Sequence, residues 1–168
     1  MSAFQDVLAK GTVTPEEAFK VWDAAPTVES YFMIASWKGF GFPTGHSFDG
    51  ALESGGWYGK NFHSADKVDP LVYKCKDGGA PWPANPDKMT PIIQRGESVQ
   101  DHRAECEADG ACARLRRVEY RGQTTAAMVY NTTPVIDLFR KIDDNTVMGV
   151  MDNITIPGPP FFFYLVRA

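Results

Sequence analysis

The sequence predicts a single, mainly β domain, built as an antiparallel barrel or sandwich. Short segments rich in β-branched and aromatic residues recur after residue 30, each bounded by Gly, Asn or Asp, and few stretches have helical spacing. A chain of 168 residues with 43% hydrophobic content can bury one core but is short for two domains. We therefore expect residues 1–168 to form one domain.

The first expected element is an N-terminal helix over residues 14–25. Thr14 suits the N-cap, Pro15 suits the first helical position, and Glu17 completes the pattern of a capping box. Apolar residues then recur on one helical face until Pro26 follows the helix.

Strands are expected where β-branched and aromatic residues gather or where apolar and polar residues alternate. Alternation is clearest between Leu115 and Arg121, as on a strand with one face in water. The expected strands cover residues 30–40, 45–49, 57–62, 68–75, 113–121, 124–131, 146–153 and 161–167.

Residues 133–142 change period and predict a short second helix among the strands. Apolar residues recur there at helical spacing after a Thr-Pro start, and Asp137 would pair with Lys141 on the outer face. Residues 76–112 are rich in Pro, Gly and small acidic residues, which predicts a flexible flap or loop insertion rather than packed structure. If this flap covers the mouth of a barrel, Trp82 and Met89 would be its apolar contacts.

Charge and composition exclude several classes of protein. The formal charge is −4 and no basic run alternates with aromatic residues, so we expect no nucleic-acid partner. No stretch approaches the roughly 20 apolar residues of a transmembrane helix, and the first residues lack the pattern of a secretory signal. The three cysteines are an odd number, which favours reduced thiols and a cytoplasmic location.

We expect no metal and no other cofactor. His46, His63 and His102 lack the close pair spacing of metal ligands, and five residues separate Cys106 from Cys112, which is unconvincing for zinc. The sequence also lacks a Gly-rich phosphate loop before a helix and a G-x-S-x-G motif.

Several groups of residues follow the spacing of a known motif and of the segment that accompanies it. In the first half they are Ala35-Ser36-Trp37-Lys38-Gly39, Thr44-Gly45-His46 and Trp57-Tyr58-Gly59-Lys60. In the second half they are Tyr120-Arg121-Gly122, Met128-Val129-Tyr130, Phe139-Arg140-Lys141 and Met151-Asp152. The chain thus resembles a family of small microbial proteins named for a Gly-x-Trp-x-Gly motif, with its C-terminal domain of unknown function.

This resemblance covers nearly the whole chain but brings no activity with it. Ala35 stands where the first Gly of the motif would be, and Asn131 follows Tyr130 where an Asp is usual. These departures are consistent with a specialised member that has its own ligand.

The chain is more distantly similar to the lipocalin and fatty-acid-binding barrels. Their first strand carries a Gly-x-Trp, and their last strand carries a basic residue packed on that Trp. Trp37 and Arg167 would take these structural parts here, a cation–π contact worth about 0.5 to 2 kcal/mol. The resemblance implies a lipocalin-like β-barrel with an N-terminal helix and a short second helix.

Four residues are candidates for acid–base chemistry. His46 follows a Gly-rich turn where a strand would reach the barrel mouth, although it is equally suited to a hydrogen bond within the turn. Lys60 lies among aromatic residues that would lower the pKa of its amine, unless it is a solvated lysine or holds an anionic head group. Asp137 or Asp152 would supply a carboxylate.

Aromatic and polar residues on the strands are expected to line the interior. Arg140 suits a structural salt bridge or a clamp on a ligand carboxylate or phosphate, and for Tyr120 or Tyr130 alone core packing is an alternative. The expected ligand-binding residues are Trp57, Tyr120, Tyr130, Phe139, Arg140, Met151, Phe161 and Phe163. The sequence does not decide whether the interior is a cavity or a filled core.

The expected function is to bind a hydrophobic small molecule, such as a terpenoid, polyketide or lipid, in the barrel. We favour an enzyme that catalyses a cofactor-independent isomerisation, cyclisation or pericyclic reaction, because His46 and Lys60 lie beside glycine-bent strand ends and the chain departs from the family pattern. Positioning alone can contribute about 7 to 11 kcal/mol to such a reaction. The alternative is a non-catalytic lipid or small-ligand carrier, and a filled interior would instead favour a structural module. The sequence does not decide whether the protein forms a homodimer.

Overall fold

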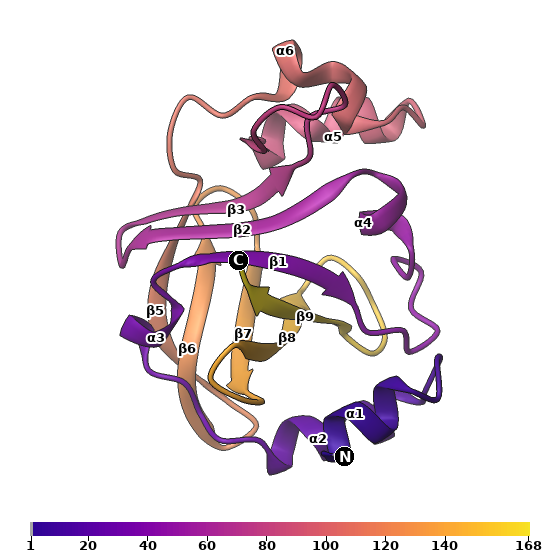
Figure 1. Cartoon of the computed structure of the whole chain (residues 1–168), viewed down its shortest axis with the longest axis vertical. Coiled ribbons are helices and arrows are strands. Elements are labelled where there is room, and N and C mark those ends of the chain that lie inside the picture. The colour runs from indigo at the N-terminus through magenta and orange to yellow at the C-terminus, as the bar shows by residue number, and fades with distance from the viewer. Residues whose placement is uncertain (1) are drawn as a thin grey trace.

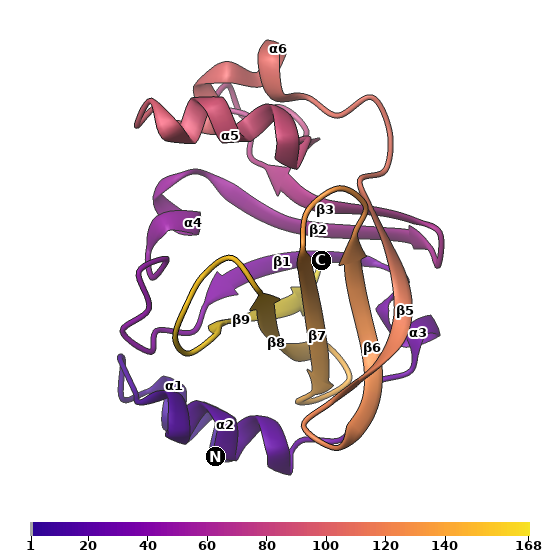
Figure 2. The ribbon, with the colours of Figure 1, turned by 180° about the vertical axis from the view of Figure 1, so that it is seen from behind.

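The computed structural model describes residues 2–168, which form nine antiparallel strands and several short helices (Figures 1 and 2). The strands are β1 Ser36–Gly41, β2 Trp57–Ser64, β3 Lys67–Tyr73, β4 Trp82–Pro83, β5 Ala113–Tyr120, β6 Gln123–Tyr130, β7 Val135–Lys141, β8 Thr146–Asn153 and β9 Phe161–Arg167. The helices are α1 Ala3–Leu8, α2 Pro15–Ala24, α3 Ser30–Met33, α4 Ala51–Ser54, α5 Pro86–Gln94 and α6 Arg103–Cys106, with a 3₁₀ helix at Val99–His102. The mainly β, antiparallel fold is as predicted.

The sheet has the strand order β2-β1-β9-β8-β7-β6-β5-β3-β4, and β2 also pairs with β3. The order of paired strands therefore closes on itself, because β2 stands first in it and also pairs with β3 near its other end. The pairing is uneven, because β3 meets β5 through the single residue pair Val68 and Ala113, whereas β5 and β6 pair along their whole length. The register between β2 and β3 also shifts at several points.

The helix α2 forms where the capping box predicts it. The Thr14 side chain accepts a hydrogen bond from the Glu17 N–H, and the Glu17 carboxylate accepts one from the Thr14 N–H, at 3.2 and 3.0 Å. α1 precedes it with its own capping box. Both helices lie along one side of the sheet (Figure 1), where Phe4 and Trp22 pack with Leu138 and Phe162. None of the helices within residues 2–168 is long and apolar enough to cross a membrane.

The predicted helix over residues 133–142 is wrong, because β7 occupies this stretch. Leu138 packs in the cluster under α1 and α2, while the next residue, Phe139, packs in the cluster on the opposite face of the sheet. A strand covered on both faces loses its polar alternation, and the remaining apolar spacing imitates a helix. The predicted pair of Asp137 with Lys141 is wrong too, since Lys141 pairs with Asp144 at 2.7 Å.

Two predicted strands also need correction. Residues 30–33 form α3, so β1 begins only at Ser36. Residues 45–49 form a turn, in which the Asp49 carboxylate accepts hydrogen bonds from backbone N–H groups, those of Thr44, Gly45 and His46. A side chain thus satisfies the amides that a strand partner would otherwise bind.

Residues 76–112 contain packed structure, contrary to the prediction, and their mobility stays a prediction. Asn85 caps α5 by accepting hydrogen bonds from two backbone N–H groups, and Pro86 occupies the first helical position. Trp82 and Ile92 are buried in the main apolar cluster. The prolines were therefore misleading, because at a helix start Pro favours the helix.

Trp37 and Arg167 lie together on paired strands. The Arg167 guanidinium lies 4.4 Å from the centre of the Trp37 ring, and the two residues face each other across β1 and β9. The motif residue Gly39 makes room for another side chain. A Cβ at this position would lie 2.0 Å from the Trp57 ring. Gly39 therefore lets the Trp57 indole lie flat against β1.

Candidate functional site

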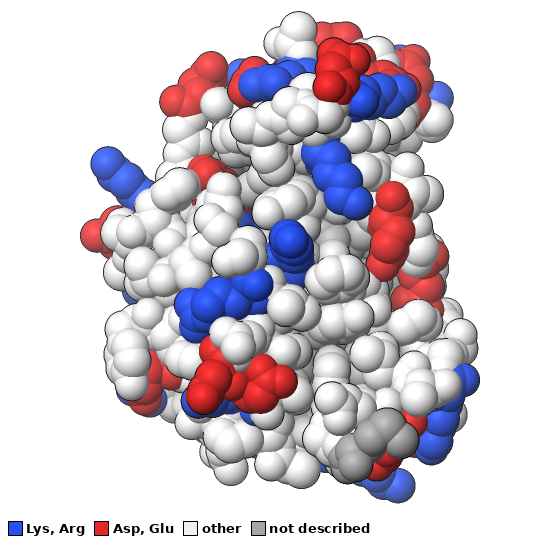
Figure 3. All heavy atoms as spheres, viewed as in Figure 1, with Lys and Arg blue, Asp and Glu red and all other residues white. Residues whose placement is uncertain are grey.

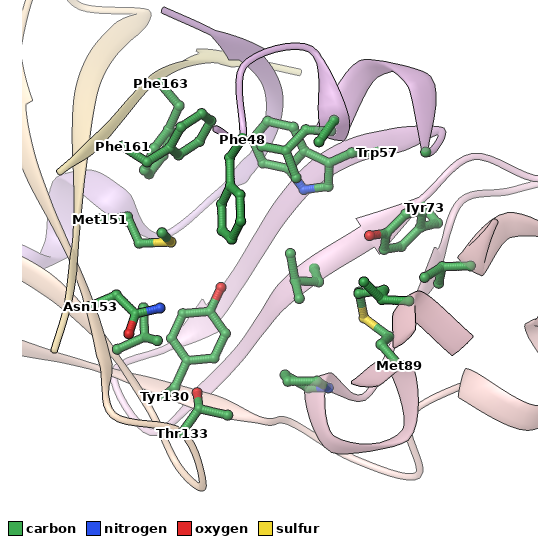
Figure 4. Close-up of a pocket in the computed structure, with 18 of the residues that line it drawn as sticks. Phe48, Trp57, Tyr73, Met89, Tyr130, Thr133, Met151, Asn153, Phe161 and Phe163 are labelled. Atoms are coloured by element: carbon green, nitrogen blue, oxygen red, sulfur yellow. The ribbon is translucent and has the colours of Figure 1, made fainter. Parts of the chain in front are cut away.

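A cavity of about 710 Å³ opens between the β2–β3 pair, strands β6 to β9 and helix α5 (Figure 4). Its wall is mainly apolar and aromatic. Figure 4 shows side chains from opposite parts of the fold facing one another across it: Phe48, Trp57, Tyr73, Met89, Met151, Phe161 and Phe163. The volume lies within the range of small-molecule sites.

A buried ion pair lines this cavity. Lys60 comes from β2 and Asp137 from β7, and the Nζ–Oδ2 distance is 2.8 Å. Each side chain is 3% exposed. Lys60 Nζ also donates a hydrogen bond to the Pro70 carbonyl oxygen at 2.9 Å, and aromatic rings surround it, the nearest being Phe163 with its centre 5.2 Å away.

Asp137 is only partly satisfied. Its Oδ1 atom is buried and has no hydrogen-bond partner among residues 2–168. Burial raises the pKa of the Asp137 carboxyl above its ordinary value, and the nearby Lys60 charge opposes this rise. The carboxylate is thus more ready to accept a proton than an ordinary aspartate.

Two hydrogen-bond donors face the same cavity from different strands. The Tyr130 hydroxyl points into the open space (Figure 4), and burial together with the Asp137 charge raises the pKa of this phenol, so it stays protonated at neutral pH. The Trp57 indole nitrogen lies on the cavity side of its ring, and within the described chain it has no hydrogen-bond partner.

The structure brings several predicted site residues into this cavity from five strands. They are Trp57, Lys60, Tyr130, Asp137, Met151, Phe161 and Phe163. Phe139 lies behind the wall and packs edge-to-face on Phe163. The pairing of Lys60 with Asp137 depends on the closing of the sheet, since the two residues lie 77 positions apart.

Other predicted residues lie elsewhere. His46, Tyr120 and Asp152 line a smaller cavity of about 170 Å³, which shares Met151 and Phe161 with the larger one. The His46 Nδ1 atom accepts a hydrogen bond from the Phe48 N–H at 3.0 Å. His46 and Lys60 therefore do not form one catalytic set.

Arg140 lies on the opposite face of β7 from the cavity. Its Nη1 atom donates hydrogen bonds to the Ala25 carbonyl oxygen at 2.9 Å and to the Gln123 side chain at 3.2 Å. The guanidinium also lies 5.5 Å from the centre of the Trp22 ring. This arrangement joins the end of α2 to the sheet and leaves Arg140 away from the cavity.

Sequence reasoning missed part of the wall. Tyr73 and Leu71 come from β3, and Ile93 comes from α5. Met89 of α5 also lines the cavity and was expected as an apolar contact over the mouth, whereas Trp82, the other expected contact, is buried in the main apolar cluster. The Asn-Pro start of α5 was a usable signal for a helix there. Nothing local indicates that this helix covers a cavity.

Charges of both signs are mixed on the protein surface. On the face shown in Figure 3, Lys and Arg side chains lie beside Asp and Glu side chains rather than in one patch. Within residues 2–168 no group of three or more His, Cys, Asp or Glu side chains is arranged to hold a metal ion.

Comparisons with known proteins place the chain in a family. The GXWXG protein family matches residues 20–78, and the domain of unknown function DUF4334 matches residues 111–167. A solved structure titled as the crystal structure of a protein from Thermomonospora curvata is 30% identical, with 100% of this chain and 99% of that chain covered and a TM-score of 0.76. The comparison with curated proteins found no match. The chain therefore belongs to the GXWXG family and carries its C-terminal DUF4334 domain.

Proposed function

We propose that this protein encloses a hydrophobic small molecule, such as a terpenoid, polyketide or lipid, and catalyses its cofactor-independent isomerisation, cyclisation or pericyclic reaction. The observation that carries the proposal is the Lys60–Asp137 pair in the wall of an apolar cavity of about 710 Å³. The strand order supports a lipocalin-like barrel around this cavity, because β2 pairs with both β1 and β3. The three free thiols support a cytoplasmic location.

The ion pair favours catalysis over passive carriage. Burying two charges costs several kcal/mol per ion before their attraction offsets it, and apolar residues of similar size would often be at least as stable. Binding of an apolar ligand by burial alone does not require this arrangement. A proton donor and a proton acceptor in an apolar cavity are what acid–base chemistry on such a ligand requires.

The residues suit a division of roles in an isomerisation. The Asp137 carboxylate would remove a proton next to a carbonyl, while Lys60 Nζ and the Tyr130 hydroxyl stabilise the negative oxygen that forms. Asp137 would then return the proton to a different carbon, which leaves the protein unchanged. In a cyclisation or pericyclic closure, the aromatic wall would hold the substrate folded and the same donors would polarise it.

The test begins with the natural ligand. Native mass spectrometry of the protein from its own source, followed by denaturing extraction, identifies what the cavity holds. The biosynthetic precursor of that molecule is then incubated with wild type, with Lys60→Met/Asp137→Leu, and with the control Lys38→Met, whose lysine is exposed on β1.

The proposal expects that the double variant binds the precursor but converts it at least about 100-fold more slowly, as for a lost acid or base. Lys38→Met should match wild type. Unchanged precursor after incubation with wild type would instead identify a carrier. Protein that is empty and does not take up the neutral dye Nile red would contradict both.

A further inference from the structure

The charged side chains that the structure describes around the cavity leave no free cation for an anionic ligand. Among the described residues that line it, the charged ones are Lys60, Asp137 and Glu97. Lys60 is matched by Asp137 at 2.8 Å. Glu97 adds a second negative charge and is itself held by Arg95 at 3.0 Å and His102 at 2.6 Å. A ligand carboxylate would therefore meet Asp137 as a like charge.

The unsatisfied polar atoms require a ligand group that both donates and accepts. An ionised Asp137 can only accept, so its Oδ1 atom needs a donor from the ligand. The Trp57 indole N–H can only donate and needs an acceptor, and the Tyr130 hydroxyl, which points into the cavity, can donate to an acceptor as well. A hydroxyl group meets both demands, because its O–H donates and its oxygen accepts.

We infer that the cavity selects an uncharged ligand bearing a hydroxyl or enol group, whose O–H donates to Asp137 Oδ1 and whose oxygen accepts from Tyr130 or Trp57, and that it discriminates against fatty-acid carboxylates. This inference rests on the proposed function, since it names the class of molecule that the same cavity binds. It also fits the proposed chemistry, because an enol is the neutral form of an enolised carbonyl.

The site differs physically from one that binds a carboxylate. Sites that bind a carboxylate use an arginine or lysine that has no counter-ion in the protein, often as a bidentate clamp. Here Arg140, the buried guanidinium nearest in sequence to the pair, is committed to the Ala25 carbonyl on the other face of β7. The one amine in the wall is already neutralised, within the part of the chain that the structure describes.

A displacement series tests the inference on the full-length protein. Nile red is bound first, and its fluorescence is then followed as dodecanol, dodecanoate or dodecyl methyl ether is added at neutral pH. The three competitors share one chain and differ at its end. Wild type should bind dodecanol at least about tenfold more tightly than dodecanoate, and more tightly than the ether, which lacks the donor.

Two variants address the mechanism of selection. In Asp137→Asn the Lys60 amine loses its counter-ion, so dodecanoate should become the better competitor. In Lys60→Met/Asp137→Leu the advantage of dodecanol over the ether should disappear. The second variant and the wild-type series decide the matter if Asp137→Asn does not fold, as judged by circular dichroism.

The outcomes separate this inference from the proposed function. If wild type takes up no Nile red, the cavity is not a ligand site and both ideas fail. If Nile red binds and dodecanoate displaces it as well as dodecanol does, the selection for a neutral hydroxyl is overturned while ligand binding stands.

Discussion

Replacing Lys60 with Met tests whether Asp137 is buried and dependent on its partner. The variant leaves a carboxylate that is 3% exposed without its counter-ion, which sits 2.8 Å away in wild type. At an effective dielectric constant of about 20, two charges at this distance attract each other by about 6 kcal/mol. In the variant we expect the Asp137 carboxylate to take up a proton, because a neutral carboxyl does not need the attraction of a counter-ion.

Protonation sets the upper limit of the destabilisation. The ordinary pKa of the carboxyl is 3.8, so holding it protonated at neutral pH costs about 4 kcal/mol, or about 1.4 kcal/mol for each pH unit. We therefore expect Lys60→Met to lower the free energy of unfolding by up to about 4 kcal/mol at neutral pH, within the range for broken buried pairs. Lys60→Met/Asp137→Leu should be about as stable as wild type or more stable.

The pH dependence follows from the direction of the shift. Burial already raises the folded-state pKa of Asp137, and loss of the Lys60 charge, which opposes that rise, will raise it further. A group with a raised folded pKa stabilises the fold fully below its unfolded pKa and loses this contribution as pH rises through the folded value. The difference between Lys60→Met and wild type should therefore shrink by up to about 1.4 kcal/mol per pH unit on acidification towards 3.8.

The assay is urea denaturation followed by circular dichroism at several pH values. Lys38→Met serves as the control at each pH, because it removes the same type of side chain from an exposed position. The reasoning is refuted if Lys60→Met lies within about 1 kcal/mol of wild type at neutral pH. It is also refuted if the difference does not change with pH.

Three further substitutions have distinct expected outcomes. Gly39→Ala should cost about 1 to 3 kcal/mol in urea denaturation and weaken Nile red binding, because its Cβ would lie 2.0 Å from the Trp57 ring; wild-type binding by this variant would contradict the packing described. Arg167→Met should lower the free energy of unfolding by about 0.5 to 2 kcal/mol, since it removes the cation from the Trp37 ring, and no loss would show that the stack is only incidental. His46→Ala should change Nile red affinity by less than about twofold, because His46 lines the smaller cavity; a large loss in the displacement assay would place it in the ligand site after all.

Local signals in the sequence explain which elements could be predicted. The capping box at Thr14 is complete within four residues, so α2 was found without knowledge of the fold. β7 was missed because its covering layers come from elsewhere in the chain and hide its alternation. The turn at residues 45–49 was missed because it depends on one carboxylate, that of Asp49, reaching three backbone amides.

The residues of the candidate site could be predicted from the sequence, but their arrangement could not. The sequence identifies Lys60 and Asp137 as separate candidates for acid–base chemistry. Lys60 is a candidate because aromatic residues lie near it, and Asp137 is one of two candidate carboxylates. No local pattern showed that they pair, and none separated His46 from them. Both facts follow from where β2, β7 and the turn after β1 lie in the folded sheet.

The sequence by itself determined the family, the mainly β antiparallel fold, the helix α2 and the residues available for chemistry, because these depend on motifs and short-range patterns. Only the tertiary structure decided that Lys60 meets Asp137 in an apolar cavity, that Arg140 faces away from it, and that α5 helps to enclose it. These relations join residues up to 115 positions apart, so the packing of distant elements sets them.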